Sequence, residues 1–252
     1  MTLAPQDWIA GLEKGLAVIE AFDASHPRLT ATEAGERCGM TRTAARRYLK
    51  TLVHLGYVDT DGKLYWLMPR ILRLGHAYLE SARLPRLVQP FLQRIGDGTG
   101  EVAYVGVLDG ADTVFIGRSG SARQPTHGYV LGTRLPAQVT AVGMAILANM
   151  EEAQSQAWLD ACVLRSFTSH TFATKEQLRA ALARFRHSGY SLSEQQLELN
   201  YRGIGVPLLD RHNQVHGAIS ITMPINHEET DHALKRVLSV MQEAAKSLRP
   251  LL

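Results

Sequence analysis

The sequence contains few cysteines and no long apolar run. Its only two cysteines, Cys38 and Cys162, lie far apart in the chain and in no CxxC or Cys/His spacing, which argues against a disulfide framework and a structural zinc site. No uninterrupted apolar run reaches the roughly 18 residues of a membrane helix, and the N-terminus lacks the basic and apolar regions of a secretory signal. We therefore expect a protein of the reducing cytoplasm that makes no contact with a membrane.

The sequence also lacks the motifs of common catalytic sites. It has no GxSxG, HExxH or phosphate-loop pattern, and Ser119-Gly120-Ser121 is typical of a loop rather than of a nucleophile elbow. His212 and His216 are four residues apart, but they flank a predicted turn and no carboxylate completes a metal-ligand spacing around them. We expect no enzymatic activity, no metal ion and no other cofactor.

Net charge and length leave the class of protein open. The formal net charge of +3 is too small to indicate nucleic-acid binding, because many enzymes and carriers have a similar excess of Lys and Arg. A chain of 252 residues, with 45% hydrophobic and 20% charged residues, is typical of a globular protein with more than one domain. The pattern of apolar residues and turns predicts domains at 1–68 and 85–252, joined by a linker helix at 69–84.

Three short helices are predicted near the N-terminus. Between Trp8 and Phe22, apolar residues recur at spacings of three and four, which predicts one buried stripe on an amphipathic helix. Thr30 and Glu33 form a capping box that begins a second helix, and Thr41 can cap a third after a tight glycine turn. Two helices joined in this way indicate a helix-turn-helix. The expected buried stripe of the first helix consists of Ile9, Leu12, Leu16, Ile19 and Phe22.

The third helix has a basic face opposite its apolar one, and no acidic residue occurs from Thr41 to Tyr57. Arg donates paired hydrogen bonds to guanine in the major groove, and the first residues of a recognition helix lie nearest the bases. The alternative is a solvated, Arg-rich face without a partner. We predict base reading by Arg42, Thr43 and Arg46, with Thr41, Arg47 and Lys50 contributing to binding closer to the DNA backbone.

A hairpin is predicted after the basic helix. The segment 58–67 has two short strand patterns around an Asp-Gly turn, and Lys63 lies at its tip, where it either contacts phosphate or is merely solvated. Helix, helix, basic helix and hairpin in this order are typical of a winged helix-turn-helix. We therefore expect double-stranded DNA as a partner.

The same elements resemble one family of bacterial regulators. Residues 11–19 (GLEKGLAVI), 41–52 (TRTAARRYLKTL) and 55–58 (LGYV) are similar to the IclR-type family. Residues 44–49 (AARRYL) and 134–137 (RLPA) resemble regulators of aromatic-acid catabolism that respond to protocatechuate or 4-hydroxybenzoate. The resemblance implies a GAF-like effector domain, a homodimer or a dimer of dimers, and, in the aromatic-acid branch, activation of transcription.

The rest of the chain predicts a linker and an α+β domain. Pro69 can begin a linker helix, and Pro85 interrupts the pattern before a further helix. A single bent helix is the alternative, but the resemblance favours a linker that also pairs subunits on a two-fold DNA site. Two strand pairs, at 101–118 and 203–223, alternate with helices near 140–150, 151–163, 175–188 and 229–250.

A ligand pocket is predicted where a strand leads into a helix at residues 129–143. Thr140 can cap a helix whose free N–H groups favour a carboxylate, and Gly143 allows close approach of a planar ligand. Arg134 can complete a carboxylate clamp. The alternative is that Arg134 is a surface ion-pair partner and that Thr140 is only a cap.

The resemblance carries further positions over to this pocket. Ser220 and Thr222 alternate with isoleucines on a predicted strand, so both hydroxyls face one side, which is either a binding wall or solvent. Met144 stands where relatives often carry a basic or other polar residue. The implied contacts are Tyr129, Ala137, Gly143 and Met144 on one wall, and Ser193, Tyr201, Gly203, Ser220 and Thr222 on the other.

Several functions remain in competition. The leading hypothesis is a DNA-binding regulator in which a small aromatic acid alters the spacing of two recognition helices and so activates catabolic genes. A regulator of the same family could instead respond to glyoxylate or pyruvate and act as a repressor. An enzyme or carrier with an incidental helix-turn-helix would need convergent catalytic residues, and a purely architectural DNA-binding protein would leave residues 85–252 without a role.

Overall fold

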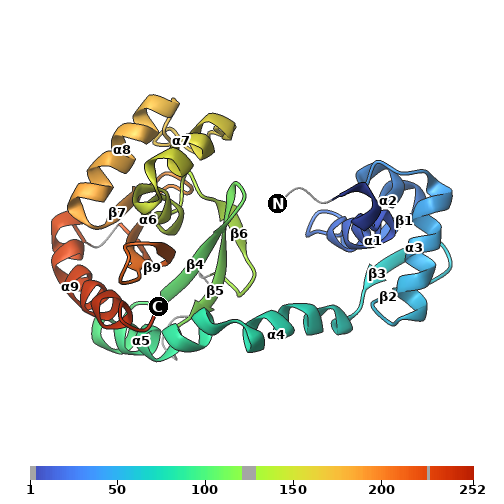
Figure 1. The fold of residues 1–252 in the computed structure, drawn as a ribbon, viewed down its shortest axis with the longest axis horizontal. Coiled ribbons are helices and arrows are strands. Elements are labelled where there is room, and N and C mark those ends of the chain that lie inside the picture. The colour runs from blue at the N-terminus through green and yellow to red at the C-terminus, as the bar shows by residue number, and fades with distance from the viewer. Residues whose placement is uncertain (1–3, 121–128, 226–227) are drawn as a thin grey trace. The chain divides into compact units, whose positions relative to one another are not determined.

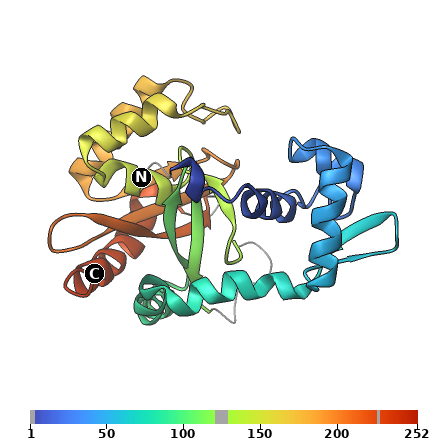
Figure 2. The ribbon, with the colours of Figure 1, turned by 45° about the vertical axis from the view of Figure 1, so that its right-hand side comes forward.

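The structure, a computed structural model, describes residues 4–120, 129–225 and 228–252. The chain forms two compact units, one up to Tyr78 and one from Leu79 onward, and each has a hydrophobic core of its own. Helices surround a small sheet in the first unit and a larger sheet in the second (Figures 1 and 2). Each unit therefore has the organisation of a domain.

The first unit is a winged helix-turn-helix. The predicted capping box is present at the start of α2, where the Thr30 hydroxyl accepts from Glu33 N and the Glu33 carboxylate accepts from Thr30 N. Gly39 has a left-handed φ of 62° in the turn before α3, and the Thr41 hydroxyl caps α3 by accepting from Ala44 N at 3.2 Å. The strands pair antiparallel in the order β1-β3-β2 and form the wing. The elements are η1 (Pro5–Asp7), α1 (Ala10–Glu20), β1 (Leu29–Thr30), α2 (Ala31–Arg37), α3 (Arg42–His54), β2 (Val58–Thr60), β3 (Leu64–Leu67), η2 (Pro69–Ile71) and the greater part of α4 (Leu72–Ser81), whose last residues belong to the second unit.

The predicted buried stripe of α1 is wrong over its first half. Val18 is completely buried, and Ile19 packs against the core of this unit. Ile9, Leu12 and Leu16 are instead 69%, 62% and 46% exposed. The spacing of apolar residues shows that they share a helix face, but it does not show what covers that face. In this chain only the C-terminal part of the stripe is covered.

The second unit is built on one antiparallel sheet of six strands, in the order β6-β5-β4-β9-β8-β7. The two predicted hairpins, β4-β5 and β8-β9, are present and join through β4 and β9. The edge strand β7 has no counterpart in the prediction. The elements are α5 (Arg83–Thr99), β4 (Ala103–Asp109), β5 (Asp112–Arg118), β6 (Arg134–Pro136), α6 (Ala141–Asn149), α7 (Glu152–Ala161), α8 (Lys175–Ser188), β7 (Ser191–Glu194), β8 (Tyr201–Leu209), β9 (Val215–Pro224) and α9 (Thr230–Leu248).

Helices cover both faces of this sheet (Figure 1). On one face, α5 and α9 pack against apolar side chains that include Ile219 and Ile221 of β9. On the other face, α6 packs against β4, β8 and β9, and α8 packs on α6. Successive side chains of a strand point to opposite faces. Ser220 and Thr222 therefore lie on the face that α6 covers, and not among the isoleucines.

The helix break in the connecting segment lies before the predicted position. Helix α4 ends at Ser81, Ala82 is extended, and α5 begins at Arg83. Pro85 therefore lies in the first turn of α5, where a missing N–H removes no helical hydrogen bond. Pro69 begins the 3-10 turn η2, which leads into α4 as expected. None of the helices in the described part of the chain combines the length and the apolar character needed to span a bilayer.

Candidate functional site

Helix α3 presents its basic residues to solvent. Ala45 and Leu49 are completely buried and hold the helix on the core of the first unit, so the opposite face is turned outward. Among the described residues, none of the basic side chains on this face has an ion-pair partner, so their positive charge is not neutralised within the protein. The exposed residues of this face are Thr41, Arg42, Thr43, Arg46, Arg47 and Lys50.

The wing carries one exposed lysine beside two aspartates, Asp59 and Asp61. Lys63 lies in the exposed turn between β2 and β3, where Gly62 has a φ of 97°. The backbone N–H groups of Leu64 and Lys63 donate to the Asp61 carboxylate, which lowers the pKa of Asp61 and fixes the turn. Arg28, which the sequence did not single out, stacks over Trp66 of β3 at 4.6 Å. The helix face and the wing together offer the donors and charges that DNA phosphates and base edges require.

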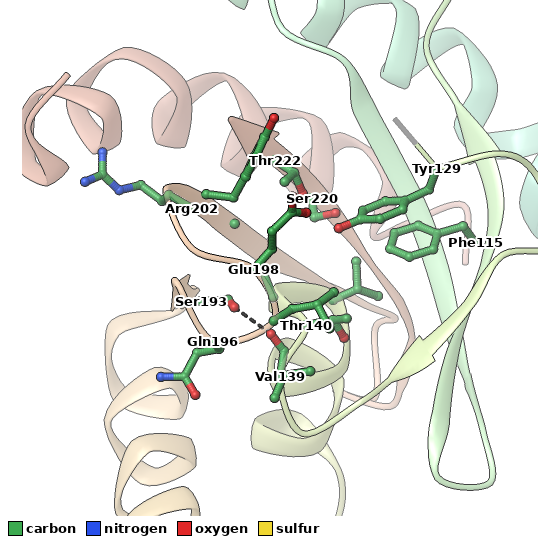
Figure 3. Close-up of a pocket in the computed structure, with 15 residues that line it drawn as sticks. Phe115, Tyr129, Val139, Thr140, Ser193, Gln196, Glu198, Arg202, Ser220 and Thr222 are labelled. Atoms are coloured by element: carbon green, nitrogen blue, oxygen red, sulfur yellow. Dashed lines mark hydrogen bonds between the residues drawn. The ribbon is translucent and has the colours of Figure 1, made fainter. Parts of the chain in front are cut away.

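A pocket lies in the second unit, on the face of the sheet that α6 covers. It has a cavity volume of about 40 Å³ within about 430 Å³ of space that includes open solvent, and it is formed by the start of α6, strands β5, β7, β8 and β9, and the segment after β7. Figure 3 shows the side chains that surround it. The structure brings together seven of the predicted contact residues here: Tyr129, Thr140, Ser193, Tyr201, Gly203, Ser220 and Thr222.

One wall of the pocket is aromatic. The rings of Phe115 and Tyr129 stack with centroids 4.6 Å apart and an interplanar angle of 21°, and Tyr104 meets Phe115 edge-on at 5.6 Å. Burial, together with the charge of the Glu198 carboxylate, raises the pKa of Tyr129 to about 12. Tyr129 is therefore a neutral phenol at physiological pH. The wall offers a planar apolar surface with a hydroxyl at its edge.

The start of α6 forms a polar end of the pocket. The Thr140 hydroxyl accepts from Gly143 N at 3.1 Å and lies 3.1 Å from the hydroxyl of Thr113. The N–H groups of Ala141 and Val142 belong to the first turn and have no partner within the helix, and both residues line the pocket. Such N–H groups, at the positive end of the helix dipole, favour an anion.

A hydrogen bond of the neighbouring strand holds this polar end in place. The Ser193 hydroxyl of β7 donates to the carbonyl of Val139 at 2.6 Å (Figure 3). Ser193 is buried, so water does not compete for this bond. The segment that leads into α6 is thereby fixed beside β7.

The guanidinium group of the pocket is already engaged. Arg202 lines the pocket but is almost completely buried, and its Nε donates to Glu194 Oε1 at 3.0 Å. Its terminal nitrogens donate to the carbonyl of Glu228 at 3.0 Å and to the Thr230 hydroxyl at 2.7 Å. The Arg202 side chain therefore supports the wall and has little capacity left for a ligand carboxylate.

The predicted carboxylate clamp at Arg134 is not formed. Arg134 is 48% exposed and does not line the pocket. Its Nη1 donates to Asp109 at 2.6 Å and its Nε to Asp112 at 3.3 Å, and these contacts raise its pKa. Strand β6 pairs with β5 so that Arg134 stands opposite Val114, near the turn that carries both aspartates. The alternative of a surface ion-pair partner is therefore the one that the structure supports.

Three other predicted contacts lie behind the pocket wall. Ala137 and Met144 are completely buried in a core with α7 and α8, and neither lines the pocket. Gly143 faces the backbone of Ala137: a methyl group added at Gly143 would lie 2.7 Å from the Ala137 carbonyl carbon and closer still to its oxygen and Cα. The glycine is required for this close packing of backbone on helix, and not for the approach of a planar ligand.

Sequence reasoning missed part of the pocket. Phe115 belongs to a predicted strand, and Val139, Ala141 and Val142 adjoin Thr140 in the predicted segment, so their positions could have indicated them. The segment after β7 carried no such signal, because it is neither strand nor helix. The pocket residues that were not predicted are Phe115, Val139, Ala141, Val142, Gln196, Leu197, Glu198 and Arg202.

Comparison with known proteins identifies relatives along the whole chain. The chain is 34% identical to the Pca operon regulatory protein of Acinetobacter baylyi, over 98% of this chain and 90% of that protein. It is 36% identical to the p-hydroxybenzoate hydroxylase transcriptional activator of the same organism, over 98% of this chain and 93% of that protein. Both relatives are regulators by name.

Solved structures support the same assignment. A transcriptional regulator from Rhodococcus sp. RHA1 has a TM-score of 0.82 at 32% identity, over 96% of this chain and 97% of that one. The inducer-binding domain of a double mutant of the PobR transcription factor from Acinetobacter, solved with 3-hydroxybenzoic acid, has a TM-score of 0.63 at 27% identity, over 68% of this chain and 100% of that one.

Two family descriptions match the two units. Residues 11–62 match the IclR helix-turn-helix domain, and residues 76–249 match the bacterial transcriptional regulator IclR C-terminal domain. The first match contains α3 with its basic face, and the second contains the pocket. The predicted fold, a winged helix-turn-helix followed by a GAF-like α+β domain, and the predicted resemblance are both confirmed. The chain belongs to the IclR family of bacterial transcriptional regulators.

Proposed function

We propose that this chain is a transcription regulator that binds operator DNA through α3 and the wing and is controlled by an aromatic carboxylate in the pocket of its second domain. The expected effectors are 4-hydroxybenzoate and protocatechuate. By analogy with the relative named as a transcriptional activator, the regulator activates genes of aromatic-acid catabolism.

The basic surface of the first unit supports the choice of DNA. Four exposed cationic side chains lie on one helix face, and that face contains no carboxylate to neutralise them. Arg42 and Arg46, in the first half of α3, are the residues for base edges, and Arg47, Lys50 and Lys63 are those for phosphates.

The observation that carries the ligand proposal is the combination of an aromatic wall with a helix N-terminus in one pocket. A benzoate ring can lie against the stacked Phe115 and Tyr129, while its carboxylate accepts from the N–H groups of Ala141 and Val142. Because Arg202 is engaged by other residues, the helix N-terminus is the group that balances the ligand charge. The PobR inducer-binding domain, solved with 3-hydroxybenzoic acid, supports the same ligand class.

Calorimetric titration tests the ligand and a DNA-binding assay tests the response. The purified protein is titrated with 4-hydroxybenzoate, protocatechuate, glyoxylate and pyruvate, and its affinity for an operator selected from a random DNA library is then measured with and without each ligand. We expect binding of the aromatic acids and a change in operator affinity. Tyr129→Ala should weaken aromatic-acid binding about tenfold by removing the stacked ring, whereas Tyr129→Phe should keep most of it.

A second candidate is a repressor of the same family that responds to glyoxylate or pyruvate. Binding of these acids, with no binding of hydroxybenzoates, would favour it and would contradict the proposed ligand class. If the protein bound neither a selected operator nor random DNA, the proposed role as a DNA-binding regulator would be wrong.

The oligomeric state and cellular location also belong to this proposal. Ile9 at the N-cap of α1, Leu12 and Leu16 of α1, and Leu72 of α4 are exposed apolar residues, which supports the expected homodimer or dimer of dimers. We propose a cytoplasmic regulator without enzymatic activity. Light scattering of the purified protein measures the oligomer.

A further inference from the structure

The pocket contains one carboxylate that the proposed binding mode does not use. Glu198 lies in the segment between β7 and β8, which is bounded by left-handed residues at Gln195 and Asn200. Its side chain extends toward Tyr129 and Ser220 (Figure 3). Glu198 is exposed, and its charge contributes to the raised pKa of Tyr129. Glu198 forms no hydrogen bond or ion pair with any other residue that the structure describes.

An uncompensated carboxylate restricts how an aromatic acid can bind. Two like charges at close range repel each other. A ligand carboxylate is therefore disfavoured beside Glu198 and is directed to the N-terminus of α6, where Ala141 and Val142 offer N–H groups. The substituent on the other side of the ring then faces Glu198.

The chemistry of Glu198 determines which substituent is favourable there. An ionised carboxylate only accepts hydrogen bonds, and a phenolic hydroxyl can donate one. A ring without a hydroxyl offers no donor to this carboxylate. A second carboxylate on the ring would meet like charge.

We propose that Glu198 selects hydroxylated aromatic acids, by accepting a hydrogen bond from the ring hydroxyl, and rejects both unsubstituted and dianionic ones. This selection rests on the proposed function, because it requires an aromatic acid in the pocket. The ligand class is a benzoate with a hydroxyl para or meta to its carboxylate. Glu198 is then a specificity-determining residue, while the aromatic wall and the start of α6 supply affinity that is common to all benzoates.

Calorimetric titration with 4-hydroxybenzoate, benzoate and terephthalate tests this selection on the full chain. The unmodified protein should prefer 4-hydroxybenzoate to benzoate by about tenfold to a hundredfold, the worth of a hydrogen bond to a charged acceptor. In Glu198→Gln the preference should fall at least about fivefold, because a neutral acceptor forms the weaker bond, and terephthalate should bind more tightly than before. In Glu198→Ala the preference for the hydroxyl should disappear. Glu243→Gln removes an exposed carboxylate of α9 outside the pocket and should change none of these ratios.

Three results would overturn the selection. If Glu198→Gln and Glu198→Ala kept the ratios of the unmodified protein, Glu198 would not face the ligand substituent. If the unmodified protein bound benzoate as tightly as 4-hydroxybenzoate, the selection would fail while the proposed function remained. A protein that bound pyruvate and no aromatic acid would overturn the proposed function, and the selection with it.

Discussion

Replacing Gly143 with alanine distinguishes a residue that contacts ligand from one that packs backbone against helix. Gly143 is in the first turn of α6, and its Cα faces the completely buried Ala137. The added methyl carbon would lie 2.7 Å from the Ala137 carbonyl carbon and closer to two other atoms of that residue. Carbon atoms in ordinary contact are about 3.5–4.0 Å apart, so the two segments must separate by about 1 Å.

The cost follows from what would have to move. The atoms in the way are backbone atoms in a packed core and cannot rotate aside. Overpacking typically costs about 1–3 kcal/mol, and we expect the upper end of this range, about 3 kcal/mol, at Gly143. For a domain of this size that corresponds to a fall of roughly 6–12 °C in the melting temperature.

Urea unfolding followed by circular dichroism measures the change, with Gly98→Ala as a matched control. Gly98 is an exposed helical glycine of α5 whose added methyl would make only an ordinary contact, at 3.7 Å from Val240. Its replacement should stabilise the domain by about 0.5–1 kcal/mol, because alanine restricts the unfolded chain. A Gly143→Ala protein of unchanged stability that had lost only ligand affinity would refute the packing argument and restore the predicted ligand contact.

Three further predictions concern charged residues. Arg46→Ala should weaken binding to a selected operator by about 1–3 kcal/mol with little effect on random DNA, as measured by fluorescence anisotropy. Lys50→Ala should instead weaken binding to both DNAs and lower the slope of log affinity against log salt concentration by about one. Equal losses for the two variants would contradict the assignment of Arg46 to base reading. Arg134→Ala should change the affinity for 4-hydroxybenzoate by no more than about twofold and the stability by no more than about 1 kcal/mol, because the ion pairs of Arg134 are exposed. A larger loss of affinity in calorimetry would indicate that Arg134 contacts the ligand. A hydrogen bond from His216 lowers the pKa of Asp210 from 3.8 to about 2, so ionised Asp210 stabilises the fold above pH 4, and this contribution is lost as the pH falls through 2. In Asp210→Asn the free energy of unfolding, measured in urea, should depend less on pH in that window. An unchanged dependence would contradict a stabilising role of ionised Asp210.

The features that the sequence predicted correctly are mostly local. Caps depend on residues three positions apart, and those at Thr30, Thr41 and Thr140 all form as expected. The basic face of α3 follows from helical periodicity alone. The two orientations of Ser220 and Ile221 follow from strand alternation, once each strand is recognised.

The errors came from residues whose environment depends on distant parts of the chain. Arg134 and Arg202 are both arginines beside predicted strands, but the register of β6 on β5 places the first among surface aspartates, and the register of β8 places the second in the pocket wall. Gly143 has the same sequence signature whether its small size serves a ligand or a neighbouring backbone. Glu198 lies in an irregular segment, for which periodicity makes no prediction.

By itself, the sequence determined the order and type of the main elements, the helix caps, the basic recognition helix and the α+β character of the second domain. These follow from interactions within about four residues along the chain or from strict periodicity. Only the tertiary structure decided which polar residues line the pocket, which arginine is engaged and which helix face remains exposed. Those properties depend on the pairing of strands and the packing of helices that are far apart in sequence, and a local pattern contains no record of either.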